Sequence, residues 1–455
     1  MWFLAIQPLS SFGRAGGDAV PAASAAAPAE QEEEIVVLRA RAGATKIDAP
    51  VRDLPQAIST IQREILEDRE IVRLEEIADA TVGVRPTLPF VGGVSLGFFV
   101  RGFNGAPILV DGVNAGVTAG DTSTVQNLGL AERVEILRGP ASVLYGQGNP
   151  GGVVNIVLKR PEERFGWAVD ATWDTFGARR VNADVTGGLG LEGLSGRLIA
   201  NFEDSETFRD FGVVRRLAAA PKIDWRFDPR TRLEVRYAYD DYTFNADRGF
   251  GFDGTLLALG IPERNLAEPT LGLTTYVSQT LRSKLSRDIA EGWTASLDFS
   301  GYRYEVRKSQ QIDLLAPLPG TLQVQRFLTI YGEPEDNAQQ DWTVSGTLQG
   351  KARFLGLGHQ IFVSAERVES FNNFSGVFDV IPSIDALAPV YSPTPLTLSV
   401  EEPFEGAFQT RTTAVYLQDL ISIGEQWKLL VGGRFDSIQT EFFDDAERND
   451  LGTEQ

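Results

Sequence analysis

Hydrophobic and polar residues alternate strictly along several stretches of the chain after Pro161. Trp167, Val169 and Trp173 occupy one set of alternate positions, and polar or small residues occupy the other. The same alternation returns later, at 223–227, 233–239, 293–299 and 427–435. Because successive side chains of a β-strand point to opposite faces, this period of two predicts strands with one apolar and one polar face.

The connections between these predicted strands are of two kinds. A short turn, Asp-Pro-Arg-Thr at 228–231, follows one strand, whereas long connections occupy 241–273 and 305–339. A soluble β-sandwich also has alternating strands, but its turns recur at regular short intervals. Short turns at one end, long loops at the other and aromatic residues near the ends of an apolar face are typical of a transmembrane barrel. The pattern therefore favours an antiparallel barrel over a sandwich, with about eleven strand candidates from Phe165 onwards.

The region before this pattern, residues 51–161, has a mixed character. The predicted elements are a strand at 56–61, short helices at 63–68 and 73–80, and short strands within 98–113 and 133–158. The prediction of the second helix is based on Ile71, Leu74 and Ile77, which recur close to helical spacing. We therefore predict a separate small α/β unit of roughly 110 residues.

The composition narrows the classes of function. The chain has 455 residues, a net charge of −20 and no cysteine. These values allow more than one domain, argue against a nucleic-acid partner, and exclude disulfides, thiolate nucleophiles and cysteine zinc sites. The single histidine, His359, excludes a metal site of several histidines and is expected to be structural or solvent-facing. No apolar run reaches the roughly 18 residues of a membrane helix, whereas 27 Phe, 10 Tyr, 7 Trp and 46 Gly suit strands and turns.

A glycine-rich stretch raises the possibility of a phosphate-binding loop. Gly146, Gly148 and Gly151 spell G-x-G-x-x-G. Such a loop needs a helix to open after it, so that amide groups and the helix dipole meet the phosphate. Here the chain continues as GVVNIVLK, which predicts a strand, and Pro150 removes one of the amides. The nucleotide interpretation fails, and we expect the glycines to serve a compact turn with close backbone approach.

The same stretch carries a resemblance to a known family. AERVEILRGPASVLYGQGNPGGVVNIVLKRP and VRGFNGAPILVDGV are similar to parts of the plug domain of TonB-dependent siderophore receptors, and EEIVVL resembles their TonB box. The resemblance covers about residues 32–161 and continues more weakly along the later hairpins. It implies a transmembrane antiparallel β-barrel whose lumen holds an N-terminal α/β plug domain.

The implied domain boundaries follow the changes in sequence character. They are a signal peptide or leader at 1–29, the TonB box and linker at 30–50, the plug domain at 51–161 and the N-terminal part of the barrel at 162–455. Small residues near 23–27 suit signal-peptidase cleavage, and a disordered Ala/Pro leader is the alternative. About eleven strands are half of the roughly 22 in the family's barrels. We therefore expect an incomplete barrel, whose open edges a bilayer would not tolerate.

The resemblance also implies a function. Members of the family are outer-membrane receptors of Gram-negative bacteria that import ferric siderophores, energised through TonB and its inner-membrane complex. For this chain it implies an Fe(III)–siderophore ligand, contact with outer-membrane lipid or lipopolysaccharide, no covalently bound cofactor, no nucleic-acid partner and no enzymatic activity. Two alternatives stay open: another scarce ligand, such as cobalamin, haem, another metal chelate or an oligosaccharide, and a truncated plug-containing fragment that transports nothing.

Finally, the resemblance assigns roles to individual residues. The TonB box comprises Glu33, Glu34, Ile35, Val36, Val37 and Leu38. Such an apolar strand can add to the sheet edge of a partner, although an ordinary linker is the alternative. Arg101 and Arg138 are the plug–barrel lock, or else solvated surface residues, and their wall glutamates are expected in later strands. The ligand-binding candidates are Arg85, Phe90, Asn104, Val117 and Thr118. Phe98 is expected in the plug core.

Overall fold

In the computed structural model, every element described below belongs to one compact unit within residues 41–455. The structure describes residue 54 and residues 57–86, 89–91, 94–95, 97–114, 128–139, 150–175, 177–247, 249, 256, 258–333, 337–394, 396, 402–424 and 426–443. The leader, the predicted TonB box at 33–38 and the ligand candidates Val117 and Thr118 lie outside these residues.

The plug region forms around a five-stranded sheet with the order β1-β9-β10-β7-β8. Its elements are β1 (Ala57–Gln62), α2 (Arg63–Asp68), η3 (Leu74–Ala80), β7 (Ile108–Val110), β8 (Val113–Asn114), η5 (Leu128–Leu130), β9 (Ala131–Arg138) and β10 (Gly152–Leu158). Two smaller sheets contain β2 (Val84–Pro86), β5 (Phe98–Val100) and β6 (Phe103–Ala106), and β3 (Pro89–Val91) and β4 (Val94–Ser95). The strand and the helix predicted at 56–61 and 63–68 are confirmed, and the helix predicted at 73–80 is a 3-10 helix.

A hydrophobic core holds the plug region together. Leu74 and Ile77 of η3 are fully buried, as their predicted spacing requires. They share one cluster with Ile136 of β9 and Ile156 of β10. Phe98 belongs to the same cluster, which confirms its predicted place in the core. Because each such side chain contributes roughly 1.5–3 kcal/mol on leaving water, these contacts explain why the segments fold together.

Gly152 opens β10 at a position that requires glycine. Its φ is +144°, and a Cβ built there would lie 2.1 Å from the carbonyl oxygen of Leu137 on β9. This contact is a close backbone approach of the kind expected for the glycine stretch, whereas Gly146 and Gly148 of the predicted compact turn lie outside the described residues. The residues that follow form a strand, so the structure agrees that the stretch does not open a helix.

We expect Gly152→Ala to destabilise the β9–β10 pair by about 1–3 kcal/mol or more, because the added methyl group must displace backbone atoms. Amide hydrogen exchange along β10 measures this loss. Gly346→Ala is the matched control, since a Cβ at Gly346 meets nothing within 4 Å. Equal exchange rates on β10 in the two variants would contradict the prediction.

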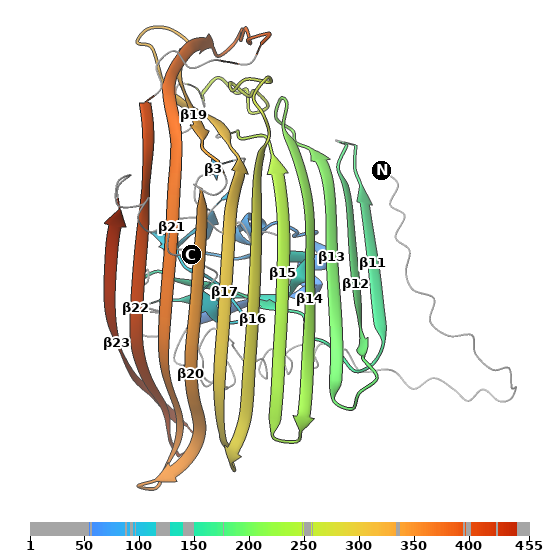
Figure 1. The fold of residues 1–455 in the computed structure, drawn as a ribbon, viewed down its shortest axis with the longest axis vertical. Helices are drawn as coiled ribbons and strands as arrows, with labels where there is room; N and C mark the ends of the chain where they lie inside the picture. Colours follow the sequence, from blue (N-terminus) through green and yellow to red (C-terminus); the bar gives the residue numbers. More distant parts are fainter. Residues whose placement is uncertain are drawn as a thin grey trace, which may run out of the picture. The chain divides into compact units, whose positions relative to one another are not determined.

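The rest of the described chain forms a 13-stranded antiparallel sheet, called the wall below (Figure 1). Its strands are β11 (Gly166–Trp173), β12 (Arg179–Gly188), β13 (Leu194–Glu206), β14 (Val213–Asp228), β15 (Thr231–Phe244), β16 (Thr274–Ala290), β17 (Trp293–Lys308), β18 (Gln310–Pro317), β19 (Gln323–Tyr331), β20 (Ala338–Phe354), β21 (Leu357–Asp385), β22 (Glu402–Ile423) and β23 (Trp427–Phe443). Apart from the hairpin β18–β19, the other eleven of the 13 strands follow one another as neighbours from β11 to β23. The sheet therefore contains about the predicted eleven strands and, in addition, the hairpin β18–β19, which the sequence did not predict.

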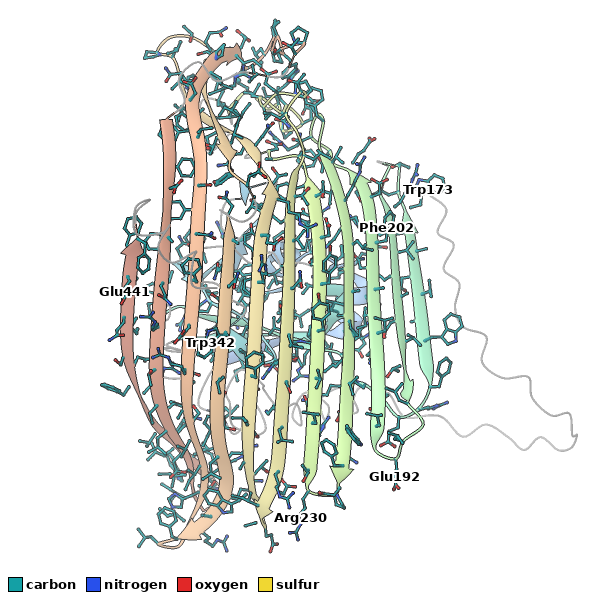
Figure 2. All side chains as sticks on the ribbon, viewed as in Figure 1. Trp173, Glu192, Phe202, Arg230, Trp342 and Glu441 are labelled. Carbon is teal, nitrogen blue, oxygen red and sulfur yellow. The ribbon has the colours of Figure 1, made fainter. Side chains whose placement is uncertain are left out.

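The wall has one apolar and one polar face, as the alternation predicts. Trp167, Val169 and Leu297 are 68%, 55% and 56% exposed. Phe202 on β13 and Trp342 on β20 are also exposed, and both are marked in Figure 2. Among the residues described, no helix is both long and apolar enough to cross a membrane. An exposed apolar surface spread over so many strands indicates a face that lipid or a partner covers.

The connection at 305–339 differs from the prediction. We expected a long loop, but this segment contains the hairpin β18–β19, which pairs with the far part of β21. Val324 and Leu328 of β19 are buried in this arrangement. β21 itself has 29 residues, well beyond the roughly 10 that span a bilayer. The partner of the hairpin lies far along the chain, so a local pattern could not reveal the pairing.

Candidate functional site

The two ends of the wall differ in the connections between neighbouring strands. Short turns join β12 to β13, β14 to β15, β16 to β17, β20 to β21 and β22 to β23. Among them is the predicted turn at 228–231. At the other end, long connections lead from β15 to β16, from β17 to β20 and from β21 to β22 (Figure 1). We call these the short-turn end and the long-loop end. The plug region contacts the polar face of the wall, and these contacts form the first part of the site.

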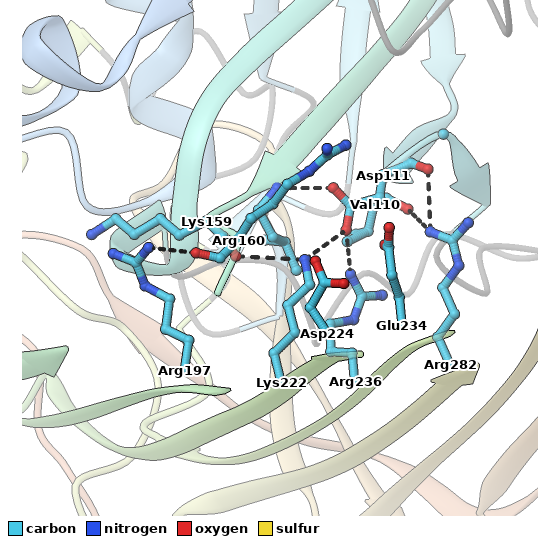
Figure 3. A network of polar contacts seen from close by, with 12 residues as sticks. Val110, Asp111, Lys159, Arg160, Arg197, Lys222, Asp224, Glu234, Arg236 and Arg282 are labelled. Atoms are coloured by element: carbon cyan, nitrogen blue, oxygen red, sulfur yellow. Dashed lines mark hydrogen bonds and ion pairs between the residues drawn. The ribbon is translucent and has the colours of Figure 1, made fainter. Parts of the chain in front are cut away.

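Asp111 joins the plug region to three wall strands (Figure 3). Its Oδ2 accepts a hydrogen bond from Arg236 Nη1 of β15 at 2.7 Å, and Lys222 Nζ of β14 lies 4.0 Å from the same oxygen. Arg282 of β16 donates to the carbonyl oxygens of Asp111 and Val110, at 3.2 and 3.5 Å. Basic side chains from three neighbouring strands therefore hold one turn of the plug.

The same aspartate is built into the plug sheet. Its Oδ1 accepts a hydrogen bond at 3.0 Å from the backbone N–H of Leu158, at the end of β10. Its own N–H donates to the carbonyl of Ile156 at 2.9 Å, and the N–H of Gly112 donates to Asn155 Oδ1 at 2.8 Å. The carboxylate is thus positioned by a strand before it meets the wall.

Electrostatics keep this carboxylate ionised. Burial alone would raise the pKa of Asp111, but the positive charges of Arg236, Lys222 and Arg282 outweigh burial and hold the pKa below its ordinary value. A lowered pKa in the folded state adds stability at neutral pH, and that contribution is lost only as the pH falls through the folded value.

Two further ion pairs connect the plug with the first strands of the wall. Lys159 Nζ lies 3.3 Å from Asp184 Oδ2 of β12, and Arg197 of β13 binds the same carboxylate at 2.6 Å. Arg73, which precedes η3, lies 3.3 Å from Glu203 of β13. In these two contacts the plug supplies the cation, whereas at Asp111 it supplies the anion. The plug–wall contact therefore uses both polarities.

An apolar contact joins the plug to later wall strands. Leu109, Leu137 and Val153 of the plug sheet pack with Phe362 of β21 and Tyr416 of β22. This cluster lies apart from the main plug core. The plug is thus held by charges against β12 to β16 and by apolar packing against β21 and β22.

The predicted lock arginines lie close together within the plug. Arg138 donates to Ser59 Oγ, to Thr81 Oγ1 at 2.9 Å and to the carbonyl of Val82 at 2.7 Å. Burial and the neighbouring charge of Arg101 lower the pKa of Arg138. Within the described part of the chain, neither arginine pairs with a wall carboxylate. Their role as a lock between plug and wall stays a prediction.

The predicted ligand-binding residues are described only in part. Arg85 on β2 and Asn104 on β6 are exposed. Phe90 lies on β3, where the backbone is described, and Figure 1 shows β3 toward the long-loop end. The ligand role of these residues also stays a prediction.

His359 has a structural environment. Its Nδ1 lies 2.6 Å from Asp419 Oδ2, and its ring stacks on Phe354 with 3.5 Å between centroids. All three residues belong to the wall. Over the described ranges, no group of three or more His, Cys, Asp or Glu side chains is placed to hold a metal ion. We therefore assign the histidine to packing of the wall.

Sequence reasoning missed a row of aromatic rings near the long-loop end. Tyr242, Phe244, Tyr276 and Tyr304 form this tyrosine row, with successive centroids 4.8, 5.1 and 5.3 Å apart. Tyr242 lies an even number of residues from Arg236 on β15, so both side chains share the plug-facing side. The sequence did contain a signal for this row. The rings occupy the alternate strand positions that lie opposite those of the exposed apolar residues.

A second row of rings crosses β19, β21, β22 and β23. This phenylalanine row comprises Phe327, Phe374, Phe378, Phe404, Phe408 and Phe442, with contacting centroids 4.9–6.4 Å apart. Phe374 lies an even number of residues from Phe362, which packs on the plug, so the row also faces the plug side. Phe408 and Phe442 are 41% and 55% exposed. Exposed rings on this face can pack on a flat or apolar ligand.

The long connections pack together at their end of the wall. We call the unit made by residues 258–273, 310–331 and 376–394 the outer cap. Inside it, Arg326 Nη1 and Glu268 Oε1 form an ion pair at 2.7 Å, with side chains 3% and 1% exposed. Arg326 also donates to two backbone carbonyls, and Glu268 Oε2 accepts the N–H of Ser392 at 2.8 Å. One buried ion pair therefore joins three segments that are far apart in sequence.

Comparison with known families identifies both parts of the chain. Residues 50–153 match the TonB-dependent receptor plug domain, and residues 224–453 match the TonB-dependent receptor-like β-barrel. The barrel match alone spans about half of the chain.

Individual relatives agree with these matches. The metal-pseudopaline receptor CntO of Pseudomonas aeruginosa is 33% identical over 88% of this chain and 56% of its own length. The ferrioxamine B receptor of Salmonella typhimurium is 26% identical over 92% of this chain and 61% of its own length. The chain thus spans somewhat more than half the length of these curated relatives.

The fold agrees as well. The crystal structure of the ferric-catecholate import receptor Fiu of E. coli has a TM-score of 0.73 with this chain at 20% identity, and the match covers 86% of this chain and 57% of that one. The plug match precedes the barrel match along the chain, which is the order of the plug region and the wall in the structure. The chain therefore belongs to the TonB-dependent receptor family, whose members are outer-membrane receptors rather than enzymes.

Proposed function

We propose that this chain acts in an outer-membrane receptor that imports metal–siderophore complexes with energy supplied through TonB. One observation carries the proposal: a folded plug is held by charges and apolar packing against the polar face of a wall whose other face is apolar. Such a wall suits lipid on one side and a filled lumen on the other. Because the plug fills the route, passage of a large ligand requires work on the plug.

The cargo that we propose is a chelate of Fe(III) or of another transition metal. The related receptors are named for metal-pseudopaline, ferrioxamine B and ferripyoverdine, all of which are metal complexes. A ferric siderophore is our first candidate. A chelate of another metal ion is the second, because the metal-pseudopaline receptor shares 33% identity with this chain.

Within this proposal the residues keep the roles that the resemblance implies. The TonB box at 33–38 adds as a strand to TonB, and Arg101 and Arg138 lock the plug to the wall. The ligand is bound between the plug candidates, including Arg85 and Phe90, and the aromatic rows at the long-loop end. The apolar face of the wall meets outer-membrane lipid and lipopolysaccharide in a Gram-negative bacterium, and the inner-membrane partners of TonB complete the energy supply.

A ligand panel tests the proposal. The receptor is titrated with a ferric hydroxamate, a ferric catecholate, a metal–pseudopaline complex, cobalamin, haem and an oligosaccharide, and tryptophan fluorescence reports binding. We expect saturable quenching with a metal chelate. Quenching only by one of the other ligands would overturn the cargo. Recovery of the protein outside the membrane fraction, with no binding, would overturn the transporter and favour a non-transporting fragment.

We expect Phe408→Ala to weaken binding of the cognate chelate by about tenfold, since an exposed aromatic contact is typically worth 1–2 kcal/mol. The dissociation constant from the same titration is the measurement. Phe435→Ala is the matched control, because Phe435 is 72% exposed on the apolar face of the wall. If both variants bind like the wild type, the phenylalanine row does not touch the ligand.

A further inference from the structure

We propose that Asp111 is a charge latch, which holds the far edge of the plug sheet on the wall and keeps the lumen closed between transport events. The proposal rests on the transport function proposed above, because a closed lumen matters only if the wall surrounds a route. It concerns the Asp-Gly turn of the plug and is separate from Arg101 and Arg138.

The cations around Asp111 depend on its charge. The side chains of Arg236 and Lys222 are 9% and 10% exposed. Among the described residues, Asp111 is the one carboxylate within 4.0 Å of either cation. Arg282 has its own partner, Asp298 at 2.6 Å, and adds contacts to the backbone of the turn. A buried cation without a counter-charge is strongly destabilising. Glu234 also acts on both cations, but Asp111 is their strongest opposing charge, so the closed position of the plug is the one that best neutralises Arg236 and Lys222.

The backbone geometry of the turn does not by itself require an aspartate at position 111. Val110 pairs with Val113, and the two residues between them, Asp111 and Gly112, have φ values of +50° and +77°. Two positive φ values define a type I′ hairpin turn, for which Asn-Gly is as suitable as Asp-Gly. Asparagine would thus satisfy the local backbone and would still accept the hydrogen bond from Leu158. The negative charge is therefore explained by its contacts with the basic side chains of the wall.

The position of the latch in the sheet gives it a specific task. The order β1-β9-β10-β7-β8 places β1 at one edge and the Asp111 turn at the other. A pull transmitted through the chain before β1 reaches that strand first, and β9 and β10 separate it from the latch. The latch therefore holds the β7–β8 edge of the plug sheet, which the pull does not reach directly. Loss of the latch should cause leakage even in cells without TonB.

The test uses Asp111→Asn in the receptor as the cell makes it, in cells that lack TonB. Sensitivity to a bulky hydrophilic antibiotic, which an intact outer membrane excludes, reports leakage through the lumen. We expect a rise in sensitivity on the order of tenfold, the change that corresponds to roughly 1.4 kcal/mol in favour of open plugs. Asp79→Asn is the control for removal of a plug carboxylate, because Asp79 is exposed on η3. It should leave sensitivity unchanged.

A double-mutant cycle separates a latch from general damage. Arg236→Gln should leak as well, and the double variant Asp111→Asn with Arg236→Gln should leak less than the two single effects combined, because the charges are removed together. If Asp111→Asn fails to reach the membrane, Arg236→Gln and Lys222→Gln carry the test with the plug sequence intact. Wild-type sensitivity in variants that reach the membrane normally overturns the latch.

A receptor lacking residues 57–158 distinguishes the two proposals. If this plug-deleted receptor does not leak, the wall does not surround a route and the proposed function fails. If it leaks while Asp111→Asn does not, the latch alone fails. A wrong assignment of the cargo leaves all of these outcomes unchanged, since the assay follows an antibiotic.

Discussion

Deletion of residues 33–38 is expected to abolish energised uptake and to leave binding of the ligand at the outer face unchanged. The sequence EEIVVL predicts an apolar strand before the plug, and such a strand can pair with a sheet edge of TonB through main-chain hydrogen bonds. Without it, no force reaches β1 and the plug stays in place. Uptake of radiolabelled metal chelate by iron-starved cells should fall to the level of cells without TonB, while the dissociation constant stays that of the wild type.

A point variant makes the same test sharper. Val36→Pro removes a backbone donor and disfavours strand pairing, so it should reproduce the deletion. Ala44→Pro places the same residue in the linker after the box and should transport normally. Wild-type uptake in the deletion variant would remove the TonB box from 33–38. A loss of uptake in both proline variants would point to the length or order of the linker instead of the box.

Glu268→Gln is expected to have the largest effect on stability. It leaves the guanidinium of Arg326 without a counter-charge in a site where both side chains are almost fully buried. Removal of one partner from a buried ion pair typically costs about 3–5 kcal/mol. Since the pair joins three segments, we expect the outer cap, including β18 and β19, to open as a unit while the wall strands outside the cap stay paired. Limited proteolysis within 258–273 and 386–394, together with hydrogen exchange on β19, measures this opening.

Two comparisons make the result interpretable. Glu263→Gln removes a carboxylate from the same connection, but Glu263 is exposed, so its cap should resist protease like the wild type. Replacing both partners, with Glu268→Leu and Arg326→Met, removes the buried charges together and should restore much of the loss. Unchanged protease resistance in Glu268→Gln would show that the apolar clusters of the cap suffice without the ion pair.

Local sequence patterns predicted most elements of the fold. The helix at 63–68 and the alternating strands of the wall depend on the spacing of apolar residues within single segments, and that spacing is written in the chain. The hairpin β18–β19 escaped prediction for the opposite reason. Its place is set by pairing with residues 376–385 of β21, and a pairing with residues so far along the chain cannot be predicted from a local pattern.

The candidate site was also predicted only in part from the sequence. Recognition of the plug motifs led to the family and to the DG segment, but the motif did not reveal which wall side chains Asp111 would meet. Arg236 and Lys222 look like ordinary polar-face residues of alternating strands. The predicted lock at Arg101 and Arg138 is not tested by the contacts described, because Arg138 bonds to hydroxyl and carbonyl groups of the plug itself.

The sequence by itself determined the family, the two-part organisation and the apolar face of the wall. These properties follow from side-chain periodicity, turn chemistry and motifs, all of which act over a few residues. Only the tertiary structure decided which charges neutralise one another across the plug and the wall, which rings align in rows, and how the outer cap closes. Many of those contacts join different strands, and some join residues far apart in the sequence, such as Asp111 with Arg236, 125 positions away. Such pairings depend on the register of whole strands, and no local pattern encodes that register.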